Sequence, residues 1–121
     1  MPSRGDSSIH TEASGTGAPR REIIYVDDAA KAIVSVLENY DKVEIPINVG
    51  SGSDVSIKQL AEMISMLVDY KGEIKWDSTK PDGQMVKLLN NTRMIKLLPP
   101  MFFTNPLDGL KKTIEWYKEN V

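Results

Sequence analysis

Cysteine is missing from this sequence of 121 residues, and histidine occurs only once, as His10. Without cysteine the chain forms neither disulfides nor thiolate metal sites, which fits a reducing compartment such as the cytoplasm. His10 lies in a polar stretch with no carboxylate or second histidine at a recognisable ligand spacing. We therefore expect no metal site and no catalytic histidine.

Long apolar runs and an excess of positive charge are also absent. No stretch approaches the roughly 18 apolar residues of a membrane-spanning helix, and the first ten residues lack the apolar centre of a signal peptide. The 15 basic and 17 acidic residues give a net charge of -2, which provides no general field for attracting nucleic acid or an anionic membrane. We expect a cytoplasmic protein without nucleic-acid or membrane partners, in which any anion site is local.

The composition fits one folded domain. With 40% hydrophobic and 26% charged residues the chain is typical of soluble globular proteins. Residues 1–18 are rich in Ser, Gly, Thr and Pro and contain almost no large apolar side chain, so they cannot bury enough surface to offset their loss of entropy on ordering. We predict a flexible amino-terminal arm over 1–18 and a folded domain over 19–121.

Short strands and helices alternate in the predicted domain. Ser56 and Gln59 have the spacing of a helix capping box, and Asn105 before Pro106 is typical of a helix start. Apolar periodicity predicts short extended segments or strands at 23–26, 45–49 and 73–76, and helices from Asp27 to about Tyr40, from Ser56 to about Val68, from Asn91 or Thr92 to about Leu98, and from Pro106 onward. The fold class is therefore a small mixed α/β lobe with about four helices.

Two adjacent arginines, Arg20 and Arg21, precede a short apolar run and a helix start. A guanidinium group is always charged, and its planar fork matches phosphate oxygens two at a time. Lys87 comes from a separate loop and, if the fold brings the three side chains together, they form a pocket for a diphosphate. The alternative is that these are solvated loop charges, as is usual for surface cations. Lys80 is a weaker fourth candidate.

Gly50 and Gly52 follow a predicted strand and precede a helix, as in a dinucleotide-binding loop. The third glycine position of that fingerprint is Val55, so a tight connection between two elements explains the glycines better. A dehydrogenase that uses a catalytic Tyr–Lys pair needs a lysine four residues after the tyrosine. None of the four tyrosines has a lysine at this position. We therefore predict no cofactor-binding and no catalytic residue in this chain.

Several motifs together resemble the GDP-L-fucose synthase family. They are Gly15-Thr16-Gly17-Ala18-Pro19-Arg20-Arg21-Glu22, Tyr25-Val26-Asp27-Asp28, Ile47-Asn48-Val49-Gly50, Val55-Ser56-Ile57-Lys58, Lys80-Pro81-Asp82-Gly83 and Lys87-Leu88-Leu89. Members are extended short-chain dehydrogenases that convert GDP-4-keto-6-deoxy-D-mannose by 3,5-epimerisation and NADPH-dependent 4-reduction. The resemblance covers Gly15 to Val121, which corresponds to the carboxy-terminal half of such an enzyme.

The resemblance implies that Arg21 and Lys87 contact the GDP part of the substrate and that Asp82 lies at the nucleotide. Ser14 replaces a tryptophan that faces the substrate in the family, and Val86 and Asn90 replace a basic and an acidic residue. Upstream of Ser14 nothing matches, and one interpretation is that part of the arm was added to the natural sequence.

The Rossmann domain that binds NADP in the family has no counterpart in the sequence, nor do the catalytic Tyr and Lys or the epimerising Cys and His. We therefore expect a GDP-sugar-binding lobe that is not competent alone, either truncated naturally or expressed as a fragment. Its partners would be a GDP-sugar and the missing Rossmann domain or a second copy. The alternative is a module without catalysis that self-associates through the former inter-domain face, so whether the chain acts as an enzyme stays open.

Overall fold

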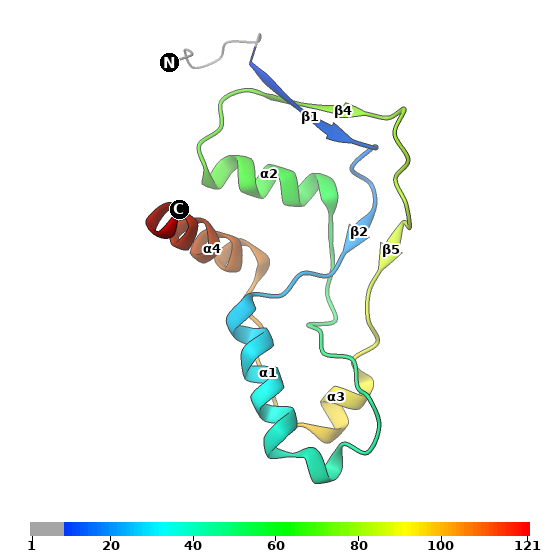
Figure 1. Ribbon diagram of the computed structural model, residues 1–121. Helices are drawn as coiled ribbons and strands as arrows, with labels where there is room; N and C mark the ends of the chain where they lie inside the picture. The colour runs from blue at the N-terminus through cyan, green and yellow to red at the C-terminus, as the bar shows by residue number, and fades with distance from the viewer. Residues whose placement is uncertain (1–8) are drawn as a thin grey trace.

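The computed structural model describes residues 9–121, which form a mixed α/β lobe of short strands and four α-helices (Figure 1). This confirms the predicted fold class. In chain order the elements are β1 (His10–Ser14), β2 (Arg20–Arg21), α1 (Val26–Glu38), a 3-10 turn (Tyr40–Lys42), β3 (Val55–Ser56), α2 (Ile57–Leu67), β4 (Glu73–Asp77), β5 (Val86–Lys87), α3 (Thr92–Leu97) and α4 (Pro106–Asn120).

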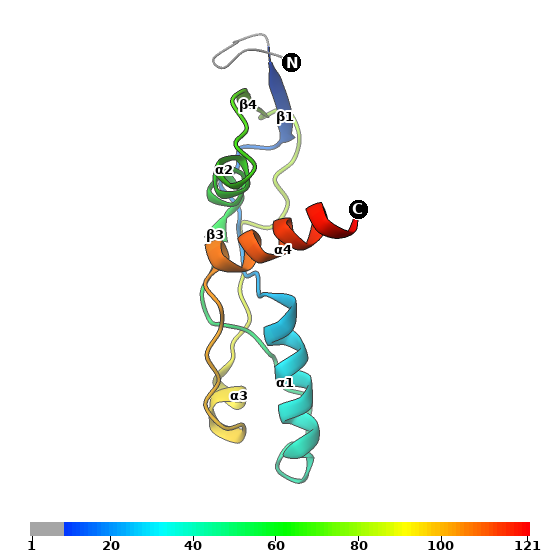
Figure 2. The same ribbon diagram turned by 90° about the vertical axis from the view of Figure 1, so that its left-hand side faces the viewer.

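The strands form two small sheets. In one, β1 runs parallel to β4; in the other, β2 lies between β3, to which it is antiparallel, and β5, to which it is parallel. The first sheet lies beside α2 at one end of the lobe, whereas α1 and α3 lie at the other end (Figure 1). Figure 2 shows the lobe edge-on as a long and narrow body, with α4 projecting from its middle.

Strand β1 differs from the predicted flexible arm. Residues His10 to Ser14 pair with Glu73 to Asp77 in continuous parallel register, and the Gly15 amide extends the pairing by donating to the Asp77 carbonyl at 2.9 Å. Four of the five β1 side chains are exposed. Backbone hydrogen bonding to β4 therefore orders this polar segment, which apolar burial alone would not do. The part of the predicted arm over 1–8 lies outside the described residues.

Two helices start as predicted. In α2 the capping box is complete, because the Gln59 amide donates to Ser56 Oγ at 3.0 Å and the Ser56 amide donates to Gln59 Oε1 at 2.9 Å. In α4 the Asp108 amide donates to Asn105 Oδ1 at 2.9 Å, and Pro106 occupies the first helical position. These local bonds satisfy amide groups that have no partner within the helix.

The predicted start of α1 is wrong by two residues. The cap position is Tyr25, whose side chain makes no capping bond, and Asp27 lies inside the first turn, where its charge faces the positive end of the helix dipole. Before the helix, Ile23 to Tyr25 form no strand, and the backbone of Tyr25 is extended. In α3 the cap position is Asn91, but it is Asn90 Oδ1 that accepts from the Thr92 amide, at 3.0 Å.

The predicted strand over 45–49 is also absent from the fold. The alternation of Ile45, Ile47 and Val49 is that of a strand, but a strand needs a neighbour to accept its backbone hydrogen bonds. Within residues 9–121 no strand pairs with this segment. The apolar pattern is therefore present without the pairing that it predicts.

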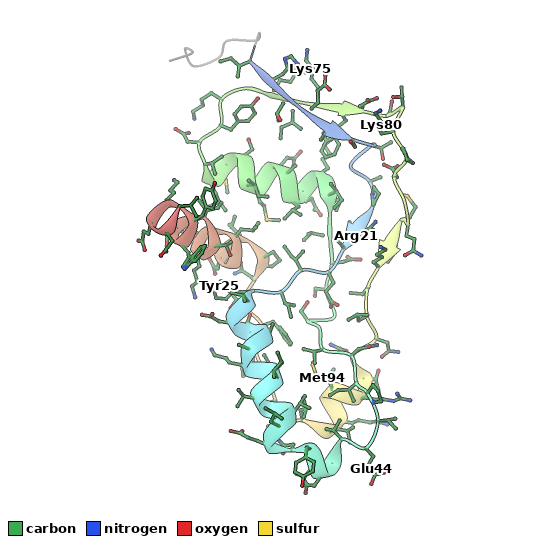
Figure 3. All side chains as sticks on the ribbon, viewed as in Figure 1. Arg21, Tyr25, Glu44, Lys75, Lys80 and Met94 are labelled. Carbon is green, nitrogen blue, oxygen red and sulfur yellow. The ribbon has the colours of Figure 1, made fainter. Side chains whose placement is uncertain are left out.

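The apolar core is small. Among the described residues the buried hydrophobic side chains are Ala32 of α1 together with Met94 and Leu98 at α3, where α1 and α3 lie close together at one end of the lobe (Figure 3). In contrast, Ile33 and Leu37 on α1 are 62% and 67% exposed. The helix thus has an apolar face that the lobe itself does not cover.

Candidate functional site

Arg21 and Lys87 lie opposite each other on neighbouring strands. Strand β2 pairs in parallel with β5 so that Arg21 aligns with Lys87, and the ladder includes bonds from the Arg20 amide to the Met85 carbonyl at 2.7 Å and from the Glu22 amide to the Lys87 carbonyl at 3.3 Å. Because side chains alternate between the faces of a strand, aligned residues of parallel strands lie on the same face. The fold therefore brings together two cations that are 66 positions apart in the sequence.

Arg20 does not join this pair. Its Nε donates to Asp54 Oδ1 at 2.9 Å, and its Nη2 donates to the Asp54 carbonyl at 3.3 Å. Adjacent residues of a strand point to opposite faces, so Arg20 lies on the face away from Arg21. The three-cation pocket predicted from the sequence is thus reduced to Arg21 and Lys87, and Arg20 instead holds the loop before β3.

The Arg21 guanidinium is fixed on one side only. Its Nη1 donates to the carbonyls of Arg20 and Gln84, at 2.8 and 2.7 Å. Among the described residues neither Arg21 nor Lys87 forms an ion pair with a carboxylate, and Nε and Nη2 of Arg21 make no hydrogen bond there. A guanidinium oriented in this way keeps donors for the oxygens of an anion, and the exposed Lys87 ammonium adds three more.

Asp82 lies in the loop between β4 and β5, and its carboxylate is bound by Thr16. Oδ1 accepts from the Thr16 amide at 2.7 Å and Oδ2 accepts from Thr16 Oγ1 at 2.8 Å. These two bonds hold the pKa of Asp82 below its ordinary value of 3.8, since hydrogen bonds to the charged form favour it. Whether Asp82 also contacts a nucleotide stays a prediction. Sequence reasoning gave Thr16 no role, because nothing local indicates a partner so distant in the chain.

Lys80 lies apart from the cation pair. Figure 3 places it at the corner after β4, whereas Arg21 lies farther along, near the middle of the lobe. Its backbone amide closes the turn by donating to the Asp77 carbonyl at 3.1 Å. The interpretation of Lys80 as a solvated loop charge agrees with this position.

The glycines before β3 surround a carboxylate. Glu22 Oε2 accepts from the Gly52 amide at 2.8 Å and from Ser51 Oγ at 3.5 Å, and Gly52 has a φ of +81°. A dinucleotide-binding loop offers such amides to a pyrophosphate instead. The arrangement supports the interpretation of Gly50 and Gly52 as a tight connection.

Residues 9–121 contain neither a cluster of metal ligands nor a helix that could cross a membrane. No group of three or more His, Cys, Asp or Glu side chains there could hold a metal ion. Within the same range, every helix is too short or too polar to cross a bilayer.

The comparisons with known proteins agree with these motifs. The model of the NAD dependent epimerase/dehydratase family matches residues 7–50. The chain is 44% identical over 109 residues to the putative GDP-L-fucose synthase 2 of Arabidopsis thaliana, covering 88% of this chain and 32% of that protein. It is 40% identical over 115 residues to the GDP-L-fucose synthase of Escherichia coli K12, covering 88% and 35%. The chain is related to part of the GDP-L-fucose synthases.

A crystal structure agrees with this relationship. The GDP-L-fucose synthetase of Naegleria fowleri, solved with NADP bound, matches with a TM-score of 0.85 at 30% identity, covering 93% of this chain and 36% of that one. The resemblance to the GDP-L-fucose synthases is thereby confirmed, and the lobe has the fold of the corresponding part of an extended short-chain dehydrogenase. The chain spans about a third of the length of the curated relatives that it matches.

Proposed function

We propose that this chain is the GDP-sugar-binding lobe of an enzyme similar to GDP-L-fucose synthase. Arg21 and Lys87 hold the diphosphate, and Asp82 lies at the nucleotide. The observation that supports this proposal is the register of β2 and β5, which aligns two cations without carboxylate partners among the described residues. Two such donors suit the oxygens of a diphosphate, which carry charge that a single cation does not balance.

Within this proposal the lobe binds and orients the substrate without performing the reaction. Relatives contain about twice as many residues beyond the matched part as within it, and we propose that the reduction and epimerisation, together with the NADP, belong to that remainder. The lobe would act in the cytoplasm, which the lack of cysteine fits.

Calorimetric titration of the intact chain with GDP, with UDP as the control nucleotide, tests the proposal. GDP should bind, and Arg21→Ala and Lys87→Ala should each weaken binding by about 1 to 3 kcal/mol, the size of a charge-assisted hydrogen bond. Lys75→Ala on the exposed face of β4 is the matched control and should bind like the original chain. A sample that is folded by circular dichroism but binds no GDP would contradict the proposal.

A second candidate function is a module that self-associates, and one observation favours it. Val26, Ile33, Leu37 and Tyr40 recur at helical spacing along α1 and its following turn, and all four are more than half exposed. We call these four residues the α1 stripe. Contiguous exposed apolar surface of this kind often marks a contact with another protein surface. If sedimentation of the chain shows a monomer at every concentration, this candidate is excluded.

A further inference from the structure

Two loops meet beside the cation pair. The first, residues 15–19, joins β1 to β2, and the second, residues 78–85, joins β4 to β5. They are joined by the two hydrogen bonds from Thr16 to Asp82, at 2.7 and 2.8 Å. We call this pair of residues the Thr16–Asp82 clasp. Both carboxylate oxygens of Asp82 are thus engaged within the lobe itself.

The loop that Asp82 anchors also holds Arg21. Two residues after Asp82, the Gln84 carbonyl accepts from Arg21 Nη1 at 2.7 Å. Gly83 lies between them with a φ of +76°, and a Cβ atom there would be 3.9 Å from Arg21 Nη2. The guanidinium therefore lies against a three-residue segment whose first member is fixed by the clasp. If the clasp opened, the Gln84 carbonyl would be free to move and Arg21 would lose one of its two anchors.

The backbone on the Thr16 side is built for this close approach. Gly15 is buried with a φ of +85°, and a Cβ atom at this position would overlap Asp82 Oδ1. Glycine adopts this backbone conformation without strain, whereas other residues rarely do. Thr16 Oγ1 also accepts from the Ala18 amide at 3.2 Å, which fixes the hydroxyl that reaches Asp82. The clasp is therefore formed entirely by groups of the lobe.

We propose that the Thr16–Asp82 clasp positions the Arg21 guanidinium for the diphosphate and makes no contact with the nucleotide base. This inference rests on the proposed function and gives Asp82 a positioning role in it. Preorganising a donor lowers the cost of ordering it when the ligand binds. The clasp therefore affects the recognition of phosphate, which every nucleoside diphosphate shares, and leaves the choice of base unchanged.

A double-mutant cycle on the intact chain, with GDP affinity as the readout, tests the positioning role. Asp82→Ala and Thr16→Val should each weaken GDP binding, by about tenfold for Asp82→Ala, and neither should weaken it further once Arg21 is alanine. Thr16→Ser keeps the hydroxyl and should restore affinity. Thr79→Val is the matched control, because it removes a threonine to aspartate bond in the same loop, to Asp77, that has no link to Arg21.

Inosine diphosphate separates the positioning role from contact with the base, since its base lacks the exocyclic amino group of guanine. The ratio of GDP to inosine diphosphate affinity should be the same with and without Asp82→Ala. A changed ratio would contradict the positioning role of the clasp and leave the proposed function intact. The same would follow if the effects of Asp82→Ala and Arg21→Ala on GDP affinity were additive. Failure of the folded original chain to bind either nucleotide would overturn both. Thr16→Val changes no charge, so it keeps the test valid if Asp82→Ala does not fold.

Discussion

Asp28, a buried carboxylate, and Thr104 are joined by a part-buried hydrogen bond. The Thr104 amide donates to Asp28 Oδ2 at 2.7 Å, and Asp28 is only 3% exposed. The bond ties the first turn of α1 to the segment that leads into α4, which are 76 residues apart in the sequence. In a lobe with few buried apolar side chains, such a bond contributes a larger share of what holds the two helices together.

We predict that Asp28→Ala lowers the free energy of unfolding by about 1 to 3 kcal/mol, because it leaves the Thr104 amide without its partner. Urea denaturation followed by circular dichroism measures the loss. The neighbouring Asp27→Ala is the matched control, since that side chain is exposed and its removal should cost only the smaller interaction with the helix dipole. Equal losses in both variants would show that the bond between Asp28 and Thr104 adds nothing to the stability beyond the loss of a charge.

The Thr16–Asp82 clasp should make stability depend on pH at the acidic end. The pKa of Asp82 is below 3.8 in the folded chain, so the unfolded chain binds a proton first as the pH falls. The stabilisation is therefore complete above about pH 4 and is lost as the pH falls through the folded pKa. Thermal melting should show a difference between Thr16→Val and the original chain at pH 7 that shrinks below pH 4.

Thr11→Val provides the control for this pH dependence, because Thr11 is an exposed residue of β1 without a carboxylate partner in the described part of the chain. Its difference in melting temperature from the original chain should not vary over the same pH range. A pH-independent effect of Thr16→Val would argue that the hydroxyl contributes only packing.

The capping box of α2 gives a third prediction. Ser56→Ala should cost about 1 kcal/mol in the free energy of unfolding, because the Gln59 amide loses its acceptor at the helix start. Ser35→Ala within α1 is the control and should not destabilise the chain, since alanine has the higher helix propensity. The urea midpoint should therefore be lower for Ser56→Ala than for Ser35→Ala. Equal midpoints would contradict the predicted contribution of the cap.

Helices α2 and α4 could be predicted from the sequence because the residues that mark the start of each helix are close neighbours in the chain. They are Ser56 and Gln59 for α2, and Asn105 and Pro106 for α4. Strand β1 could not, since its order comes from β4, which lies far along the chain. The segment over 45–49 shows the reverse case, in which a segment with a strand pattern pairs with no strand in residues 9–121. Strand signals are incomplete without the partner that accepts their hydrogen bonds.

The candidate site was predictable to a similar extent. Arg21 and Lys87 were predicted from their charge and again from the resemblance of motifs, whereas Asp82 came from the resemblance alone. The register of β2 and β5 then aligned Arg21 with Lys87. Arg20 and Arg21 have different partners because side chains alternate between the two faces of β2. The sequence alone does not show which arginine lies on which face. Thr16 required the structure, because its partner lies 66 residues away.

The α1 stripe gives the last prediction. Because the apolar side chains of the stripe are exposed, the chain should self-associate as its concentration rises. Leu37→Lys adds a charge to the contact and should therefore shift the midpoint of self-association to a higher protein concentration. Val121→Lys is the control, since that exposed apolar residue lies at the end of α4, outside the stripe. Sedimentation velocity over a dilution series measures both variants. If Leu37→Lys and Val121→Lys behave alike, any association of the chain uses another surface, and the stripe has no part in it.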